Sequence, residues 1–187
     1  MEYISDKNFE KSDIEQALTL GEYENCTFKG LVFANMDLSS FKFLECKFVT
    51  CDISNTRLDN TAFNNCSFED CKILGTRFDR CESMLLEFSF KNSLLDHCSF
   101  YQLKLKQTVF KDCSMKGVDF TECDLSSASF VNCNLENATF DQTKLEKADL
   151  STAYNYTIDP ERNYIKKAVF SSEGLSGLLT KYDLKIK

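Results

Sequence analysis

Residues 123–142, CDLSSASFVNCNLENATFDQ, place a large apolar side chain at every fifth position. These apolar residues are Leu125, Phe130, Leu135 and Phe140. A cysteine or an alanine stands two positions before each of them, and mostly polar residues fill the rest of the stretch. A repeat of fixed period has to be interpreted before any local propensity for helix or strand.

The same spacing extends over most of the chain, at about 26 positions. It runs from Tyr23 to Phe78, shifts by two residues, and continues from Leu85 to Leu150. A period of five fits neither the 3.6-residue turn of an α-helix nor the two-residue alternation of a flat strand. Each unit is therefore a short extended piece followed by a bend, and positions i and i−2 share its inward face.

Four such units close a coil of twenty residues, because every fourth apolar position carries a similar side chain. The clearest columns, in the second half of the chain, are Phe90, Phe110 and Phe130, and Leu105, Leu125 and Leu145. Stacked coils pair backbone to backbone about 4.8 Å apart. We therefore predict an all-β solenoid in which each unit buries its apolar face against its neighbours.

One repeat domain with two caps accounts for the 187 residues. We expect an N-terminal cap at 1–20, the repeat domain at 21–152 and a C-terminal segment at 153–187. The phase shift near 79–90 is either a widened corner or a small projecting loop. The polar N-terminal residues and the absence of a long apolar run predict a cytoplasmic protein with no membrane contact.

The ten cysteines follow the repeat, since nine of them stand two positions before an apolar position and Cys81 lies in the phase shift. The chain contains no C-x-x-C pair, and stacked coils do not offer the converging geometry that a disulfide prefers. We expect reduced, buried thiols that act as small hydrophobic residues, with no metal and no cofactor.

Catalytic motifs are absent from the sequence. His97 is the only histidine and takes an outward position. A filled, narrow solenoid core leaves no room for a substrate pocket, so we predict that the protein is not an enzyme. The acidic repeat surface also predicts no direct contact with nucleic acid, and Lys104 and Lys106 form only a local positive spot.

The net charge of −7 is distributed unevenly, because no Lys or Arg occurs between Lys116 and Lys144. The carboxylates of this window, called the acidic strip below, are Asp119, Glu122, Asp124, Glu136 and Asp141. In the square coil, the first, second and fifth of these share one outer face and the other two lie just around its corners. The strip is either an ordinary solvated surface or an anionic surface that competes for a phosphate-binding site.

The C-terminal segment carries a second candidate interface. Ser171 to Glu173 predict the start of a helix, and alternation in the last residues predicts a final strand. The apolar side chains of this segment are Leu175, Leu178, Leu179, Tyr182, Leu184 and Ile186. The open end of a solenoid is a sheet edge that needs a cap. We expect these residues to cap the rod and to join two copies as a two-fold homodimer.

The repeat CTFKG from Cys26, CDLSS from Cys123 and ADLST from Ala148 resembles the motif of the pentapeptide-repeat family, small–polar–Leu/Phe–polar–polar. That resemblance implies a right-handed quadrilateral β-helix with a short C-terminal helical cap. Six to seven coils would make a rod roughly 30 Å long.

The start NFEKSD and the ending GLLTKYDLKI look like the quinolone-resistance (Qnr) group, to which the microcin B immunity protein is related. This likeness implies an acidic, rod-shaped homodimer that imitates duplex DNA and binds DNA gyrase or topoisomerase IV, with resistance to quinolones or to a toxin as its effect. The alternative is a structural or scaffolding module that binds another protein.

Overall fold

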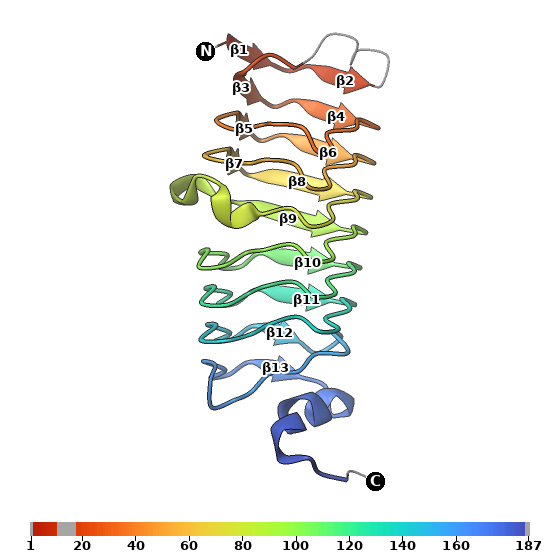
Figure 1. Ribbon diagram of the computed structural model, residues 1–187, viewed down its shortest axis with the longest axis vertical. Coiled ribbons are helices and arrows are strands. Elements are labelled where there is room, and N and C mark those ends of the chain that lie inside the picture. Colours follow the sequence, from red (N-terminus) through yellow and green to blue (C-terminus); the bar gives the residue numbers. More distant parts are fainter. Residues whose placement is uncertain (1, 11–17, 186–187) are drawn as a thin grey trace.

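The computed structural model describes residues 2–10 and 18–185, which form a rod of stacked coils. The N-terminal and C-terminal ends of the chain lie at opposite ends of the rod (Figure 1). The described strands are short and are β1 (Glu2–Ser5), β2 (Asn8–Glu10), β3 (Gly21–Glu24), β4 (Thr27–Lys29), β5 (Lys42–Leu44), β6 (Lys47–Val49), β7 (Ala62–Asn64), β8 (Cys66–Glu69), β9 (Phe88–Lys91), β10 (Val109–Lys111), β11 (Ser129–Val131), β12 (Asp149–Leu150) and β13 (Val169–Phe170).

All of these strands pair in parallel, in two sheets that run along the rod. The first face of the rod is the sheet of nine strands, in the order β13-β12-β11-β10-β9-β8-β6-β4-β2. The four-stranded sheet, in the order β1-β3-β5-β7, begins the fourth face. Phe110 pairs with Phe90 on one side and with Phe130 on the other, so the predicted coil of twenty residues is confirmed.

Isolated bridges mark the other faces. The second face begins with Val32 opposite Asp52, and the third face begins with Asp37 opposite Arg57. The fourth face continues in the lower half of the rod through the column Lys104, Asp124, Lys144 and Tyr164. The chain is therefore a square solenoid with four walls, as the repeat predicts.

The rod is longer than the repeat alone predicts. Nine strands in the first face give eight steps of about 4.8 Å, or about 38 Å. The extra length comes from both ends of the chain, because β2 pairs with β4 and β13 pairs with β12.

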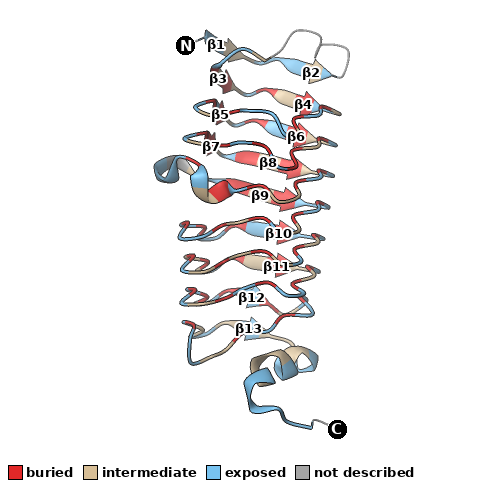
Figure 2. Cartoon of the chain, viewed as in Figure 1, coloured by how far each residue is buried: buried red, intermediate tan, exposed pale blue. Residues whose placement is uncertain are grey.

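A ladder of aromatic rings fills the interior of the rod, and Figure 2 shows that burial recurs in the coils that follow the first one. The Phe90 and Phe110 ring centroids lie 5.5 Å apart with an interplanar angle of 1°. Rings on opposite walls meet edge to face, as Phe110 and Phe120 do at 6.1 Å and 74°. Both geometries are favourable for aromatic pairs, so the core is solid and leaves no internal channel through the described coils.

The small residues before the apolar positions have a specific role. Cys46 Sγ lies 3.3 Å from the carbonyl oxygen of Tyr23 in the preceding coil, and Thr61 Oγ1 donates to the carbonyl oxygen of Leu38 at 2.7 Å. A thiol and a hydroxyl both satisfy a buried carbonyl group at this position. Cysteine and threonine are interchangeable where this bond is made, as at Cys51, Thr56 and Cys66.

The phase shift forms a projecting loop. Its two 3-10 helices are η2 (Phe78–Arg80) and η3 (Ser83–Leu85), which stand out beyond the outline of the coils in Figure 1. Cys66 pairs with Phe88, a spacing of 22 residues, so the two extra residues are absorbed here. Of the two alternatives left open by the sequence, the structure has the loop.

The C-terminal segment is helical, as the sequence predicts. It contains two short 3-10 helices in place of one amphipathic α-helix. Residues Glu173–Leu178 form the 3-10 helix η4, and Thr180–Tyr182 form the 3-10 helix η5. Ser172 makes no side-chain capping bond, and the two helices are interrupted at Leu179. The predicted final strand is wrong for the residues that the structure describes, because Leu184 and Lys185 belong to no strand. Ile186 lies outside the described residues.

Candidate partner-binding surfaces

The third face brings together the three carboxylates that the sequence places on one wall. Asp119 pairs with Ser99 and Thr139 in its column. The Glu122 amide donates to the carbonyl oxygen of Asp141 in the next coil at 2.8 Å. The three side chains thus lie on two adjacent coils, about 4.8 Å apart along the rod.

Two carboxylates of the acidic strip lie around the corners, as expected. Asp124 belongs to the fourth face, in the column of Lys104 and Lys144. Glu136 follows Leu135, an apolar position of the second face whose amide bonds to Tyr154 in the next coil. The five positions therefore lie where the square coil predicts, but their electrostatic surroundings do not match the sequence.

Three members of the acidic strip have a cation from another coil beside them. Arg162 lies 2.7 Å from Asp141, and Lys116 lies 3.1 Å from Glu136. Lys106 lies 3.5 Å from Asp124. Each cation is about twenty residues from its partner in sequence. A stretch of sequence without Lys or Arg can therefore form a surface on which cations from other coils lie.

Hydrogen bonds further define the Asp124 carboxylate. Partial burial raises its pKa, but hydrogen bonds from the hydroxyl and amide of Ser126 lower the pKa more, to below its ordinary value. Asp124 is therefore a locally bonded turn carboxylate and contributes less than an exposed group to an anionic surface.

Asp119 and Glu122 remain as the anionic centre of the strip, since the described residues place no cation within 4.0 Å of either. Asp119 accepts the amide of Thr121 at 2.9 Å, which fixes the turn. Glu122 is exposed and accepts Nε2 of Gln102 at 2.8 Å. Neutral donors hold both carboxylates in place without cancelling their charge.

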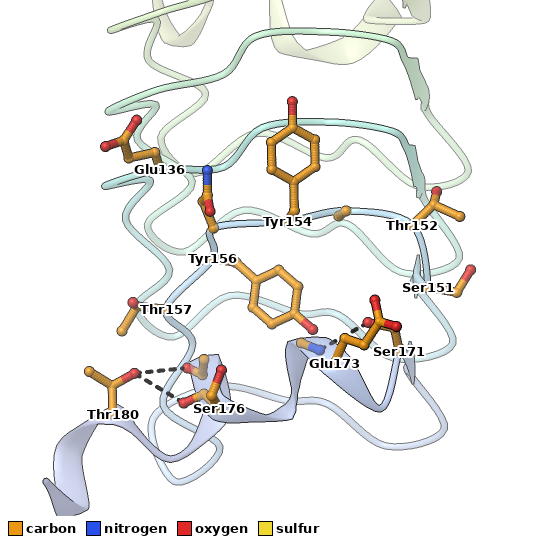
Figure 3. Close-up of a pocket in the computed structure, with 14 residues that line it drawn as sticks. Glu136, Ser151, Thr152, Tyr154, Tyr156, Thr157, Ser171, Glu173, Ser176 and Thr180 are labelled. Atoms are coloured by element: carbon orange, nitrogen blue, oxygen red, sulfur yellow. Dashed lines mark hydrogen bonds between the residues drawn. The ribbon is translucent and has the colours of Figure 1, made fainter. Parts of the chain in front are cut away.

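The C-terminal segment packs on the last coil through two glycines. Figure 3 shows Tyr156 reaching from the last coil toward the segment that carries Ser171 and Glu173. A Cβ on Gly174 would lie 2.0 Å from the Tyr156 hydroxyl, and one on Gly177 would lie 2.2 Å from the Tyr156 carbonyl oxygen. Only glycine permits this approach, so these two residues set how closely the segment docks.

A shallow groove of about 650 Å³ follows this seam. Burial raises the pKa of the Tyr156 phenol, and its hydroxyl has no hydrogen-bond partner among the described residues. The groove has a mixed polar lining that includes Tyr154, Asn155 and Thr180. We interpret it as the joint between the cap and the rod.

The predicted dimer residues divide into two groups. Leu178 packs against the core, as a cap residue should. Leu175, Tyr182 and Leu184 are exposed by 48%, 52% and 57%. These three side chains are accessible in the C-terminal segment, while Leu179 is half-buried.

The cysteines are all buried, as predicted, and each is a free thiol. Burial raises the pKa of Cys46 and of Cys98 to about 12, and it raises the pKa of Cys66 as well. A thiol that stays protonated and buried is a poor nucleophile. Among the described residues, no cluster of His, Cys, Asp and Glu has the arrangement of a metal site.

Sequence reasoning missed Phe88, which fills the position where other coils carry a small residue. It is buried, and its ring centroid lies 5.4 Å from that of Phe78. The only available signal was its place two residues before Phe90. Within residues 2–10 and 18–185, no helix is long and apolar enough to cross a membrane.

Comparison with known proteins agrees with this architecture. Residues 78–150 match the model of the pentapeptide repeat region. No curated protein sequence matches the chain. Residues 78–150 thus carry the pentapeptide repeat, and the chain has the parallel β-solenoid fold of pentapeptide-repeat proteins.

Among solved structures, full-length QnrB1, a plasmid-mediated fluoroquinolone resistance protein, is similar over 97% of both chains, with 15% identity and a TM-score of 0.63. A trypsin-treated form of QnrB1 is similar over 100% of both chains, with 16% identity and a TM-score of 0.51. At this level of identity the likeness concerns the fold.

Proposed function

We propose that this protein is a non-enzymatic DNA mimic that binds DNA gyrase or topoisomerase IV through the third face of its rod. The observation that carries the proposal is the anionic centre at Asp119 and Glu122, set on a rod that shares its whole length in fold with a quinolone-resistance protein. The rod, about 38 Å long, corresponds to about eleven base-pair steps of 3.4 Å.

The third face holds three carboxylates at fixed positions. Asp119, Glu122 and Asp141 lie on two adjacent coils that are hydrogen-bonded to each other. Carboxylates held on a rigid wall imitate a phosphate backbone without the entropic cost of ordering flexible side chains. A basic groove made for duplex DNA would be attracted to such a wall, and the attraction would fall steeply with salt.

The resulting complex is expected to protect the enzyme from a quinolone or a toxin, or to inhibit it. In a cytoplasmic setting a homodimer joined through the C-terminal segment would present two such rods end to end. The dimer would double the length over which the enzyme's DNA-binding surface is matched.

The test replaces the three carboxylates by amides, in D119N, E122Q and D141N together. Amides keep the hydrogen bonds that Asp119 and Glu122 accept, so the turn geometry is retained. Supercoiling of relaxed DNA by gyrase and relaxation of supercoiled DNA by topoisomerase IV are measured with and without the purified protein. We expect the wild type to change the activity at micromolar concentration and the triple variant to lose most of this effect.

The matched control lies on the first face, on the opposite side of the rod. Asp149 accepts a turn amide from Ser151, Asp112 accepts Nδ2 of Asn132, and Glu69 pairs with Lys91. These three reproduce the bonding of the test residues, so D149N, D112N and E69Q remove the same charge from the opposite wall. Equal loss of the effect in both variants would mean that the net charge of the protein, and not the acidic strip, causes it. If the wild type had no effect on either enzyme, the scaffolding alternative would be favoured.

A further inference from the structure

The lower half of the fourth face carries a cluster of lysines that the sequence does not reveal, because its members come from three coils. We call this cluster the lysine face, and its members are Lys104, Lys106, Lys144, Lys147, Lys166 and Lys167. All six side chains are exposed.

Backbone pairing fixes how these residues are placed. Lys104 and Lys144 stand in one column, separated by Asp124 and therefore by two coil steps, or about 9.6 Å. The Lys147 amide donates to the Lys166 carbonyl oxygen at 3.0 Å, which puts those two on neighbouring coils. The cluster is thus a compact surface within an acidic protein.

Few carboxylates balance these lysines. Lys106 pairs with Asp124 at 3.5 Å, and the other five have no carboxylate within 4.0 Å among the described residues. Six lysines face Asp124 and Glu146, and Glu87 lines the groove beside Lys104 and Lys106, which leaves a local charge of +3. The protein as a whole has a net charge of −7, so the lysine face stands out in sign as well as in density.

A groove opens beside the lysine face, below the projecting loop. It has a volume of about 530 Å³ and is lined by apolar groups of Leu86, Phe88 and Val109 together with Lys104 and Lys106. Val109 is 44% exposed, so an apolar side chain that enters the groove can pack against it. Positive charge and an accessible apolar surface therefore meet at one place.

We propose that the lysine face and this groove bind an acidic polypeptide segment of a partner protein, with an apolar side chain of the segment seated in the groove. The lysines attract the carboxylates and steer the encounter, and the groove supplies the apolar contact that adds affinity. The proposal does not depend on the binding of a topoisomerase by the acidic strip.

The observations favour a polypeptide over duplex nucleic acid. The fourth face shares a corner with the third face, where the exposed Glu122 lies. A wide polyanion lying across the fourth face would come within about one Debye length, roughly 8 Å, of these acids and would be repelled. A single narrow chain reaches the lysines without passing over them, and duplex DNA has no side chain to occupy the apolar groove.

The experiment measures the fluorescence anisotropy of a labelled ten-residue polyglutamate peptide with one central leucine. The probes for comparison are the same peptide without leucine, a twelve-base-pair DNA duplex and vesicles of anionic phospholipid. We expect saturable binding of the leucine-containing peptide, weaker binding of the other three probes, and loss of affinity as salt is raised.

The main variant neutralises four lysines, in K144Q, K147Q, K166Q and K167Q together. Glutamine is accepted at the corner positions, because Gln107 and Gln142 adopt the same positive φ angles, 61° and 52°, as Lys147 does at 60°. From the usual strength of exposed ion pairs, we expect binding to weaken roughly tenfold. The matched control replaces four exposed lysines of other surfaces, in K7Q, K29Q, K47Q and K111Q, and is expected to bind within about twofold of the wild type.

A second variant tests the groove separately. Val109→Glu introduces a carboxylate there, and it is expected to remove the advantage of the leucine-containing peptide over plain polyglutamate. The proposal is overturned if the wild type does not bind the leucine-containing peptide, or if the quadruple lysine variant binds it like the control. It is equally overturned if the duplex or the vesicles bind more tightly than the peptide.

Discussion

Arg162 donates from Nη2 to Oδ2 of Asp141 across 2.7 Å, although 21 residues separate the two in the chain. The bond joins the last coil to the acidic strip and places a cation at its edge. In a solenoid the electrostatic neighbours of a residue are those one coil away, and the charge pattern along the chain describes them poorly. This relationship gives a direct test of the acidic strip.

Replacing Arg162 by glutamine is expected to strengthen the effect of the protein on gyrase or topoisomerase IV. The substitution exposes the Asp141 carboxylate and adds one negative charge to the third face. Exposed ion pairs contribute little to stability, about 0.2–1 kcal/mol, so the fold should tolerate the change. The measurement is the protein concentration that gives half of the maximal change in supercoiling.

The control for this variant is Arg57→Gln, at the other end of the same face. Arg57 pairs with Asp37 and Asp59, so its loss adds the same charge far from the acidic strip. A gain of equal size in both variants would mean that net charge decides the effect, and weaker activity of R162Q would count against the acidic strip.

The ten thiols are expected to react with a thiol reagent only after the protein unfolds. Each cysteine is buried, and burial raises the pKa of the Cys46 thiol to about 12. At pH 8 the native thiol is therefore almost entirely protonated as well as inaccessible. Titration should find ten thiols in denaturant and few without it, whereas fewer than ten in denaturant would mean that some cysteines form disulfides.

The small residue two positions before each apolar residue should stabilise the fold through its hydrogen bond, so a replacement of the same shape without that bond should be destabilising. Thr61→Val removes the hydroxyl that donates to the Leu38 carbonyl at 2.7 Å in a fully buried site. The Leu38 carbonyl keeps the Phe41 amide as a donor at 3.2 Å, so the loss of this one buried bond should lower the free energy of unfolding by about 0.5–1.5 kcal/mol. The same change at the exposed Thr139 should alter it by less than about 0.5 kcal/mol. Chemical denaturation of both variants measures the difference, and equal values would remove this role for the small position.

The sequence predicts the fold almost completely because one period controls every coil. Five-residue spacing, columns such as Phe90, Phe110 and Phe130, and buried cysteines all follow from one constraint, that inward side chains must stack in register. Local propensity has little influence under such a repeat, so the prediction is secure wherever the period is intact.

Where the period is interrupted, sequence and structure diverge. Directly after the loop at residues 78–87, Phe88 takes a position that the repeat reserves for a small residue, since the two additional residues leave room for its ring. In the C-terminal segment Gly174 and Gly177 bring the backbone against Tyr156, and 3-10 geometry replaces the amphipathic α-helix.

The candidate surfaces were predictable in position but not in charge. Asp119, Glu122 and Asp141 do share a wall, as the square coil requires. Their ion pairs and the lysine face depend on residues about twenty positions apart. A scan for charge in a short window does not detect such neighbours, and a scan at the period of the coil would have found them.

Dimer formation is expected to depend on the exposed part of the C-terminal segment. Leu175 and Leu184 are largely exposed and do not hold the cap, unlike Leu178, which packs against the core. Changing both to aspartate should give a monomer with the circular dichroism of the wild type, because charge in an apolar interface is costly. Leu94→Asp, at an exposed site on the second face, is the control. Sedimentation velocity measures the outcome, and a wild type that is monomeric at high concentration would refute the proposed dimer.

Docking of the C-terminal segment is expected to depend on pH through the cluster formed by Lys181, Asp159 and Glu161. Lys181 Nζ lies 2.8 Å from Asp159 and 2.7 Å from Glu161. Hydrogen bonds from Lys181 are the main cause that lowers the pKa of both carboxyls below their ordinary values of 3.8 and 4.5. The same bonds raise the pKa of Lys181 above its ordinary 10.5.

These shifts fix the sign of the effect. A carboxyl with a lowered pKa stabilises the folded state above its ordinary pKa, and this contribution is lost as the pH falls through the folded-state value. A lysine with a raised pKa stabilises below its ordinary value and loses that contribution as the pH rises through the folded-state value. Docking should therefore be strongest between about pH 5 and 10 and should weaken below about pH 4.

The Ile158 amide reports on this docking, because it donates to the Gly177 carbonyl oxygen at 3.0 Å. Its protection factor in hydrogen exchange, corrected for the intrinsic rate, should fall below about pH 4 relative to that of the Leu145 amide, which donates to Tyr164 within the rod at 2.8 Å. Lys181→Met should produce the same loss at pH 7, since it removes the shared cation without changing the carboxylates. Protection at Ile158 that persists both at pH 3 and in the Lys181→Met variant would mean that Tyr156 and the two glycines alone hold the segment in place.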